Sequence, residues 1–209
     1  IEDHSWVAID IHHDSGEQAT LSTHKIRSIN KAGSMYCRQL LKKLQQALNV
    51  TGELMEANFP YHFITADGYT WYISFSHSHQ HAAVLISPYA NIGIDVEDSA
   101  ISHQVASRFF SPHEYQWLNQ KPAVNQAVLR NLLWRLKECA IKTHQNVDKQ
   151  LIKELKHDVL DELGEEVINQ LIGAYEINAK DKPIQCVQTD AKIVGNFSSK
   201  PCSFIIVNR

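Results

Sequence analysis

The sequence predicts an α+β protein made of two similar units, each with a long helix packed on a small antiparallel sheet. Two segments have the spacing of long amphipathic helices, and short alternating segments rich in β-branched residues accompany each of them. The 209 residues suit one large domain or two small ones, and 44% apolar residues allow a sizeable core. We expect subdomains at 1–98 and 99–209, with a site in a cleft between them.

The first half is expected to contain four strands and a helix. Residues 5–11, SWVAIDI, alternate as a strand does, and residues 24–50 then show helical spacing. Residues 70–75 and 81–87 flank the polar stretch SHSHQ, which predicts two strands joined by a tight turn. Residues 91–96, NIGIDV, follow as the fourth strand of this half. The apolar positions of the helix are Cys37, Leu40, Leu41, Leu44 and Leu48.

The second half changes from a helical to a β pattern. Apolar spacing predicts helices over residues 101–110, 112–120 and 123–144. The charged segment that follows, residues 146–167, predicts helix and loop. β-Branched residues and polar breaks then predict a terminal antiparallel sheet from residues 183–190, 191–197 and 202–208.

Composition excludes some classes of function. A formal net charge of −3 gives no overall attraction to nucleic acid or to an anionic membrane, so we expect neither as a partner. No apolar run approaches the roughly 20 residues that span a bilayer. The four cysteines are far apart without a C-x-x-C pattern, which predicts reduced thiols and a cytoplasmic protein. Neither a P-loop nor a dinucleotide-binding glycine motif is present.

Two short segments carry candidate chemistry. In strand 91–96 and the residue after it, Asp95 and Glu97 share one face, and two neighbouring carboxylates usually need a cation. On the helix 123–144, Glu138 and Lys142 lie four residues apart, away from the apolar stripe. Each pattern also has an ordinary explanation, namely a solvated strand face and an exposed ion pair worth about 0.2–0.5 kcal/mol.

Together, these segments resemble the signature of the 4′-phosphopantetheinyl transferase superfamily. GIDVE at residues 93–97 resembles the motif G-[IV]-D-[IVL]-E, and WRLKECAIK at residues 134–142 resembles W-x-x-K-E-[SAC]-x-x-K. Two further stretches, FSHSH and RFFSPHEY, resemble other motifs of the family, and all four stand in family order. The resemblance covers residues from about 73 to 142 and is closest to the two-halved, monomeric branch.

The resemblance implies an α+β pseudo-dimer that binds coenzyme A between its halves. Such enzymes move the 4′-phosphopantetheine arm of coenzyme A to a serine of an apo acyl or peptidyl carrier protein, releasing adenosine 3′,5′-bisphosphate. Asp95, Glu97 and Glu138 match the family's ligands for Mg²⁺, a hard cation that prefers oxygen ligands. Lys142 matches the lysine that reaches the pyrophosphate, and Lys137 is a neighbouring lysine of the motif.

The resemblance assigns further residues to coenzyme A. His77 matches a phosphate-contacting histidine, and Ser76 precedes it in the same motif. Arg38 matches an arginine of the first helix that would bind the 3′-phosphate, although a solvated basic face is the alternative. Members commonly carry G-K-P or G-R-P upstream of the histidine motif, whereas ANFPYHF in this chain retains only Pro60.

Glu114 has two interpretations that the sequence leaves open. Ser111, Pro112 and Glu114 form the pattern of a helix capping box. The resemblance instead implies that Glu114, together with Glu138, helps to deprotonate the attacking serine. The two roles do not exclude each other.

Two rival functions remain at this stage. His77, His79 and His81 could share a strand face and bind zinc, as in a zinc-dependent hydrolase. However, these histidines flank an expected turn, and no H-E-x-x-H motif supports them. The second rival is a homologue that binds coenzyme A without catalysis.

Overall fold

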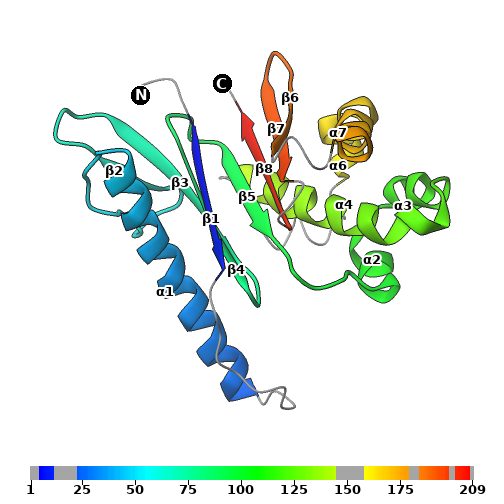
Figure 1. Cartoon of the computed structure of the whole chain (residues 1–209), viewed down its shortest axis with the longest axis horizontal. Coiled ribbons are helices and arrows are strands. Elements are labelled where there is room, and N and C mark those ends of the chain that lie inside the picture. Colours follow the sequence, from blue (N-terminus) through cyan, green and yellow to red (C-terminus); the bar gives the residue numbers. More distant parts are fainter. Residues whose placement is uncertain (1–4, 12–22, 145–157, 179–183, 198–200, 208–209) are drawn as a thin grey trace.

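The computed structural model describes residues 5–11, 23–144, 158–178, 184–197 and 201–207. It contains two four-stranded antiparallel sheets with helices on both sides, which confirms the predicted α+β class (Figure 1). None of the described helices combines the length and the apolar composition that crossing a membrane requires.

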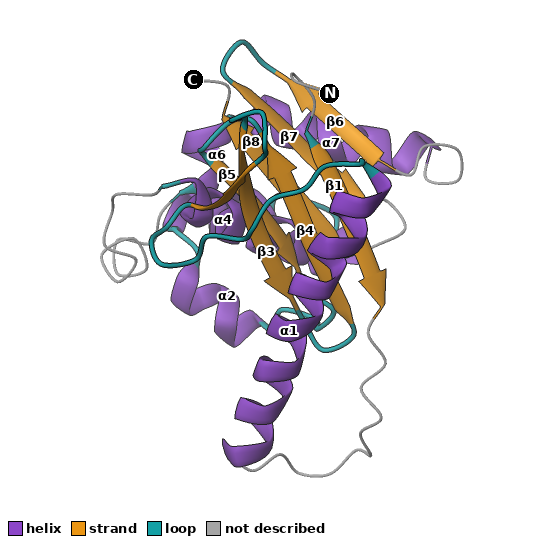
Figure 2. Cartoon of the chain, turned by 90° about the vertical axis from the view of Figure 1, so that its left-hand side faces the viewer, coloured by secondary structure: helices purple, strands orange, loops and turns teal. Residues whose placement is uncertain are grey.

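The first sheet carries the long N-terminal helix on its outer face. Its strand order is β1-β4-β3-β2, with β1 at Trp6–Ile11, β4 at His81–Ser87, β3 at Thr70–His77 and β2 at Tyr61–Ile64. Helix α1, Thr23–Ala47, crosses in front of this sheet (Figure 2). Burial of an apolar helix face against a sheet is what holds such a pair together. The buried residues between them include Cys37, Leu40, Leu41, Phe63, Trp71 and Ile73.

The second sheet carries the remaining helices. Its order is β5-β8-β7-β6, with β5 at Ile92–Val96, β8 at Cys202–Val207, β7 at Lys192–Phe197 and β6 at Ile184–Gln188. The helices are α2 at His103–Phe109, α3 at Pro112–Asn119, α4 at Ala123–Thr143, α6 at Val159–Leu163 and α7 at Glu165–Asn178. The core beneath them includes Leu133, Leu136, Leu160, Ile168, Leu171 and Ile205.

A third apolar cluster joins the two sheets. It combines residues of β4 with residues of β5 and β8, so the inner faces of the sheets pack together and α1 and α4 lie on opposite outer sides (Figure 1). Its buried members are Ala83, Leu85, Ile92, Ile94, Val96, Cys202, Phe204 and Ile206.

The strand at Ile92–Val96 departs from the prediction. We expected it to close the first half, but it pairs with β8 as the edge strand of the second sheet. Its partner lies about a hundred residues later in the chain, and local alternation does not reveal so distant a pairing. The boundary predicted at residue 98 stays a prediction, although β5 already belongs to the sheet of the second half.

The sequence patterns did not predict strand β2 or most of helix α7, but they did predict the turn between β3 and β4. Strand β2 has only four residues, and α7 extends well beyond residue 167, where the predicted helix and loop segment ends. The turn between β3 and β4 is confirmed by their antiparallel pairing, in which His77 faces Ala82. In the charged segment 146–167, residues 146–157 lie outside the described residues, and α6 forms part of the remainder.

Candidate functional site

Strand β5 and helix α4 touch through their backbones at Gly93 and Cys139. A Cβ atom added at Gly93 would lie 2.1 Å from the carbonyl oxygen of Cys139, much closer than any real contact. Only glycine permits this approach, which explains the first residue of GIDVE in physical terms. The contact sets α4 directly against the strand that carries Asp95.

Asp95 forms an ion pair with Lys142 at this crossing. The carboxylate is 7% exposed, and its Oδ1 accepts hydrogen bonds from Lys142 Nζ at 2.9 Å and from Ser76 Oγ at 2.9 Å. Lys142 Nζ also donates to the carbonyl oxygen of Ile94 at 2.7 Å. In the described part of the chain both side-chain bonds end on Oδ1, so Oδ2 is the oxygen through which Asp95 can reach a further cation.

Two serine side chains of β3 bind the backbone of β5. The N–H groups of Ile94 and Val96 donate to the hydroxyls of Ser74 at 3.1 Å and of Ser76 at 3.2 Å. Since β5 pairs with β8 on its other side, these hydroxyls satisfy buried donors that would otherwise lack partners. Ser76 therefore links three features of the site, namely the end of β3, the backbone of β5 and the carboxylate of Asp95.

Lys142 is the cation of the site. Burial of its side chain is the largest single effect and lowers the pKa, but the charge of Asp95, the hydrogen bond to it and the charge of Glu138 act together in the other direction, so the pKa is raised from its ordinary value. Lys142 is therefore charged at neutral pH. A fixed ammonium group in a half-buried position is suited to binding and stabilising anionic phosphate oxygens.

Glu97 and Glu138 flank this ion pair without closing a ligand set. Glu97 is half-buried, and its Oε1 accepts a hydrogen bond from the backbone N–H of Ser99 at 2.8 Å. Glu138 is half-buried on α4, one turn before Lys142. Among the described residues, the oxygens of Asp95, Glu97 and Glu138 are not gathered within 4.8 Å of one another. The chemistry of the donor set, three carboxylates on two contacting elements, nevertheless fits a hard divalent cation.

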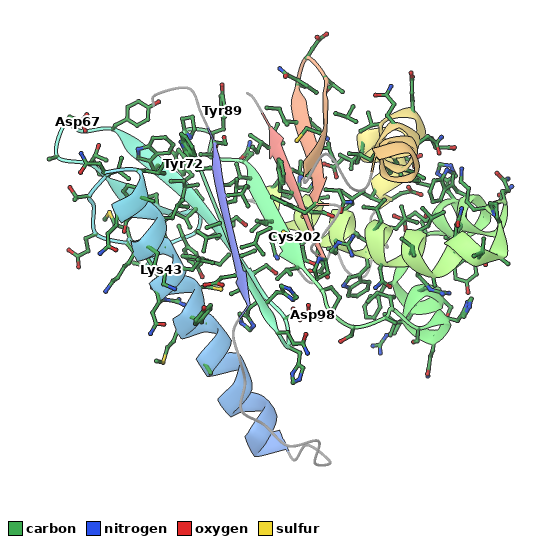
Figure 3. The ribbon with its side chains drawn as sticks, viewed as in Figure 1. Lys43, Asp67, Tyr72, Tyr89, Asp98 and Cys202 are labelled. Atoms are coloured by element: carbon green, nitrogen blue, oxygen red, sulfur yellow. The ribbon has the colours of Figure 1, made fainter. Side chains whose placement is uncertain are left out.

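The turn after β3 is held by Asp98, which the sequence analysis did not single out. Asp98 accepts hydrogen bonds from the hydroxyl of Ser78 and from the backbone N–H of Gln80 at 2.6 Å, and it pairs with the ring of His81. Burial raises its pKa, but these hydrogen bonds outweigh the burial, and the pKa is lowered. Asp98 lies near the end of the sheets where this turn is found (Figure 3). The sequence did contain a sign of this role, because Asp98 is a third acidic residue directly after the GIDVE motif.

The three histidines of the zinc hypothesis do not form a metal site. His81 is engaged by Asp98, and His79 is exposed on the turn. No group of metal-ligating atoms in the described residues includes any of the three. His77 instead packs against α1, since a Cβ at Gly33 would lie 2.7 Å from its Nδ1.

Glu114 and Lys137 form a buried pair in the second core. Glu114 is 0% exposed, and it accepts hydrogen bonds from Lys137 Nζ at 2.8 and 2.7 Å, from Ser111 N at 2.7 Å and from Val159 N at 2.8 Å. The capping box with Ser111 is confirmed. Burial lowers the pKa of Lys137, and the charge of Glu114 opposes this.

This pair bears on two predicted site residues. The side chain of Lys137 is 6% exposed and its ammonium faces Glu114, so it does not point toward a pyrophosphate beside Lys142. Its predicted contact with coenzyme A stays a prediction, and such a contact would require this ion pair to open first. The acceptor positions of Glu114 are filled by four hydrogen bonds from three donor groups, which leaves no oxygen for a serine hydroxyl in this arrangement.

Arg38 is bound within the first half. Its guanidinium pairs with Glu56, with Nε donating at 3.0 Å, and its Nη1 donates to Ser34 O and Oγ at 2.6 Å. The guanidinium lies 5.7 Å from the ring centre of Phe75. The side chain is 38% exposed, so a phosphate can approach it but must compete with Glu56.

Comparison with protein families finds one match to this part of the chain. Residues 91–187 match the sequence model of the family described as ACPS, the 4′-phosphopantetheinyl transferase superfamily. The matched range covers just under half of the chain, begins at the strand of Asp95 and includes all of α4. No curated protein matches the chain.

Proposed function

Because residues 91–187 match the sequence model of the 4′-phosphopantetheinyl transferase superfamily, we propose that this protein transfers the 4′-phosphopantetheine arm of coenzyme A. The acceptor is a serine of an apo acyl or peptidyl carrier protein, and the leaving group is adenosine 3′,5′-bisphosphate. The observation that carries the proposal is the ion pair of Asp95 and Lys142 at the Gly93–Cys139 contact, where both family motifs meet.

Lys142 is proposed to bind the pyrophosphate of coenzyme A. Its raised pKa keeps it protonated, so it can stabilise charge on the departing phosphate and hold a proton there. In phosphoryl transfer most of the rate acceleration comes from positioning and from neutralising charge, which is what a lysine held by two acceptors can supply.

Asp95, Glu97 and Glu138 are proposed to hold Mg²⁺. When bound, this cation would neutralise the negative charge of the pyrophosphate and orient it. Asp95 is held by Ser76 and Lys142, whereas Glu97 and Glu138 are half-buried acids on either side of it in the two motifs. We therefore expect the ligand set to close only when the cation and the pyrophosphate are present.

Several other roles follow from the position of each side chain. His77, next to Ser76 at the end of β3, is proposed to donate a hydrogen bond to a phosphate of coenzyme A. Arg38 is proposed to bind the 3′-phosphate in exchange for Glu56. We propose Glu138 as the group that accepts the proton of the carrier serine, because Glu114 is fully buried and its acceptor positions are occupied.

The proposal extends to the setting of the reaction. Carrier proteins of this class are acidic, so we propose that the docking surface offers basic and apolar groups near the site. We further propose that the protein acts as a cytoplasmic monomer.

A mass measurement tests the function. The purified protein is incubated with coenzyme A, Mg²⁺ and an apo carrier protein, and the carrier is expected to gain the mass of one phosphopantetheine arm. Asp95→Asn, Glu138→Gln and Lys142→Met are each expected to reduce the rate at least 100-fold. Glu53→Gln is the control, because this acid is exposed and distant from β5 and α4 along the chain.

The outcomes separate the possible functions. If the protein binds coenzyme A but the carrier stays unmodified, the protein is a non-catalytic coenzyme A-binding homologue. Full activity of Asp95→Asn at limiting Mg²⁺ would contradict the proposed ligand set. Each variant is checked for native circular dichroism, so that loss of folding is not mistaken for loss of chemistry.

A further inference from the structure

A second cluster of ionisable side chains lies where α3 meets α6 and α7. His113 is in the first turn of α3, Asp158 is the N-cap of α6, Asp161 belongs to α6, and Glu165 opens α7. His113, Asp158 and Asp161 are the one group of three potential metal ligands, within the residues that the structure describes, whose ligand atoms all lie within 4.8 Å of one another.

The two ring nitrogens of His113 face different carboxylates. Nδ1 lies 3.3 Å from Asp158 Oδ2 and 3.2 Å from Asp161 Oδ1, while Nε2 lies 3.1 Å from Glu165 Oε1. A neutral imidazole has one N–H and one lone pair. If the N–H donates from Nε2 to Glu165, the lone pair on Nδ1 faces two carboxylate oxygens, which is favourable only with a cation between them.

The spacing of these atoms fits a tetrahedral ion. Zinc bonds to imidazole nitrogen and carboxylate oxygen are about 2.0–2.2 Å long, so neighbouring ligand atoms of a tetrahedron stand about 3.3–3.5 Å apart. The separations of 3.3 and 3.2 Å from Nδ1 to the two aspartate oxygens lie close to this range. A ligating histidine commonly donates its second N–H to a carboxylate, and Glu165 occupies that position.

Asp158 is already oriented for this role. Its Oδ1 accepts hydrogen bonds from the N–H groups of Leu160 at 2.9 Å and of Asp161 at 3.1 Å, and Oδ2 accepts one from the hydroxyl of Ser111. The capping of α6 thus directs Oδ2 toward His113. The side chain of Asp161 is 73% exposed, and that of His113 is 42% exposed, so an ion and a water ligand can reach the position from solvent.

We propose that His113, Asp158 and Asp161 bind a divalent zinc ion, with Glu165 orienting the histidine ring. Three protein ligands leave a fourth position for water. The ion joins the start of α3 to α6 and α7, and it is distinct from the Mg²⁺ site on β5 and α4. Because α6 also donates Val159 N–H to Glu114, zinc at this position stabilises the packing around the buried pair. The proposal does not depend on the transferase activity.

A protonated ring is the competing state. Without an ion, the hydrogen bond with Glu165 is the largest cause that raises the pKa of His113, and the charges of Asp158 and Asp161 act in the same direction. An imidazolium could then hold the three carboxylates by itself. The experiment must therefore measure metal binding directly.

Titration calorimetry with Zn²⁺ provides that measurement. Tag-free protein is treated with a chelator, dialysed and titrated at pH 7.5 in the Asp95→Asn background, which disables the proposed Mg²⁺ site. We expect one equivalent of zinc, at least tenfold weaker binding in His113→Ala and Asp161→Asn, and unchanged binding in the control His79→Ala. His79 is an exposed histidine outside the cluster, so it tests for non-specific binding.

Thermal unfolding gives a second readout. Zinc is expected to raise the Tm of the Asp95→Asn protein and to leave the Tm of His113→Ala in that background unchanged. The proposal is overturned if the parent and His113→Ala proteins bind zinc equally. It is equally overturned if neither binds zinc, in which case the cluster holds a protonated histidine.

Discussion

The ammonium nitrogen of Lys142 lies 2.9 Å from Oδ1 of Asp95 and 2.7 Å from the carbonyl oxygen of Ile94. Helix α4 thus brings a positive charge to the strand carboxylate before any ligand arrives. Burial of an unpaired carboxylate would be costly, and the lysine offsets that cost. A diphosphate bound together with a cation can replace this ion pair, since the cation attracts Asp95 and the phosphate attracts Lys142.

The two serines of β3 offer a matched test of Asp95. Ser76→Ala and Ser74→Ala each leave one buried N–H of β5 without its acceptor, so each is expected to lower the free energy of unfolding by about 1–3 kcal/mol. Only Ser76 also donates to Asp95. We therefore expect Ser76→Ala, and not Ser74→Ala, to change the Mg²⁺ concentration required for half-maximal activity. Equal Mg²⁺ dependence in both variants would argue against the site.

Gly93→Ala is expected to separate α4 from β5. The added methyl group would overlap the carbonyl oxygen of Cys139, and backbone atoms cannot move aside cheaply. We expect a loss of about 3 kcal/mol or more in urea unfolding, with reduced activity in the protein that remains folded. Gly173→Ala is the control, because no atom lies within 4 Å of its added Cβ. Its helical position predicts a gain of about 0.5–1 kcal/mol instead.

The buried pair of Glu114 and Lys137 predicts a non-additive result. Glu114→Gln or Lys137→Met alone leaves one buried charge without its partner and is expected to cost about 3–5 kcal/mol in chemical denaturation. The double variant removes both charges and should recover part of that loss. If folded Glu114→Gln instead lost turnover at full stability, Glu114 would be the catalytic base that we assign to Glu138.

Arg38 can be tested with a substrate that lacks one phosphate. Arg38→Met is expected to raise the KM for coenzyme A about tenfold and to leave the KM for 3′-dephospho-coenzyme A unchanged. Glu56→Gln should lower the KM for coenzyme A, since it releases the guanidinium from its present partner. Equal effects of Arg38→Met on both substrates would show that Arg38 acts on the fold and not on the 3′-phosphate.

The four free cysteines should differ in reactivity. Burial raises the pKa of Cys37 to about 11 and that of Cys202 to about 12, and it raises the pKa of Cys139 as well. Since the thiolate is the reactive form, these three should resist alkylation at pH 8 until the protein unfolds. Cys186 is exposed and should be modified in the native state. Peptide mass spectrometry after timed alkylation distinguishes the sites, and rapid native labelling of Cys139 would contradict the β5–α4 packing.

Much of the site was legible in the sequence because its parts are short local patterns. GIDVE and WRLKECAIK each occupy one element, and the structure brings Asp95 of the first to Lys142 of the second. The burial of Lys137 could also have been predicted from the sequence. It lies one helical turn after Leu133 and one before Ile141, both buried, so helical spacing alone directs it into the core.

Other features depend on distant contacts that local patterns do not encode. The pairing of β5 with β8 joins residues about a hundred positions apart, so alternation predicted the strand but not its sheet. Strand β2 is too short to show a period, and the role of Asp98 depends on the turn between β3 and β4. The proximity of His113 to Asp158 depends on how α3, α6 and α7 pack together, which no local pattern predicts.

The hydroxyls of Ser74 and Ser76 also affect how the protein behaves in concentrated solution. An unpaired strand edge is a template on which another molecule can add its own strand, and this is a common start of aggregation. Here the inward edge of β5 is occupied by side chains of the same molecule. Replacing both serines would leave two buried backbone donors without acceptors, so each opening of the seam between the sheets would present an unpaired strand edge to neighbouring copies.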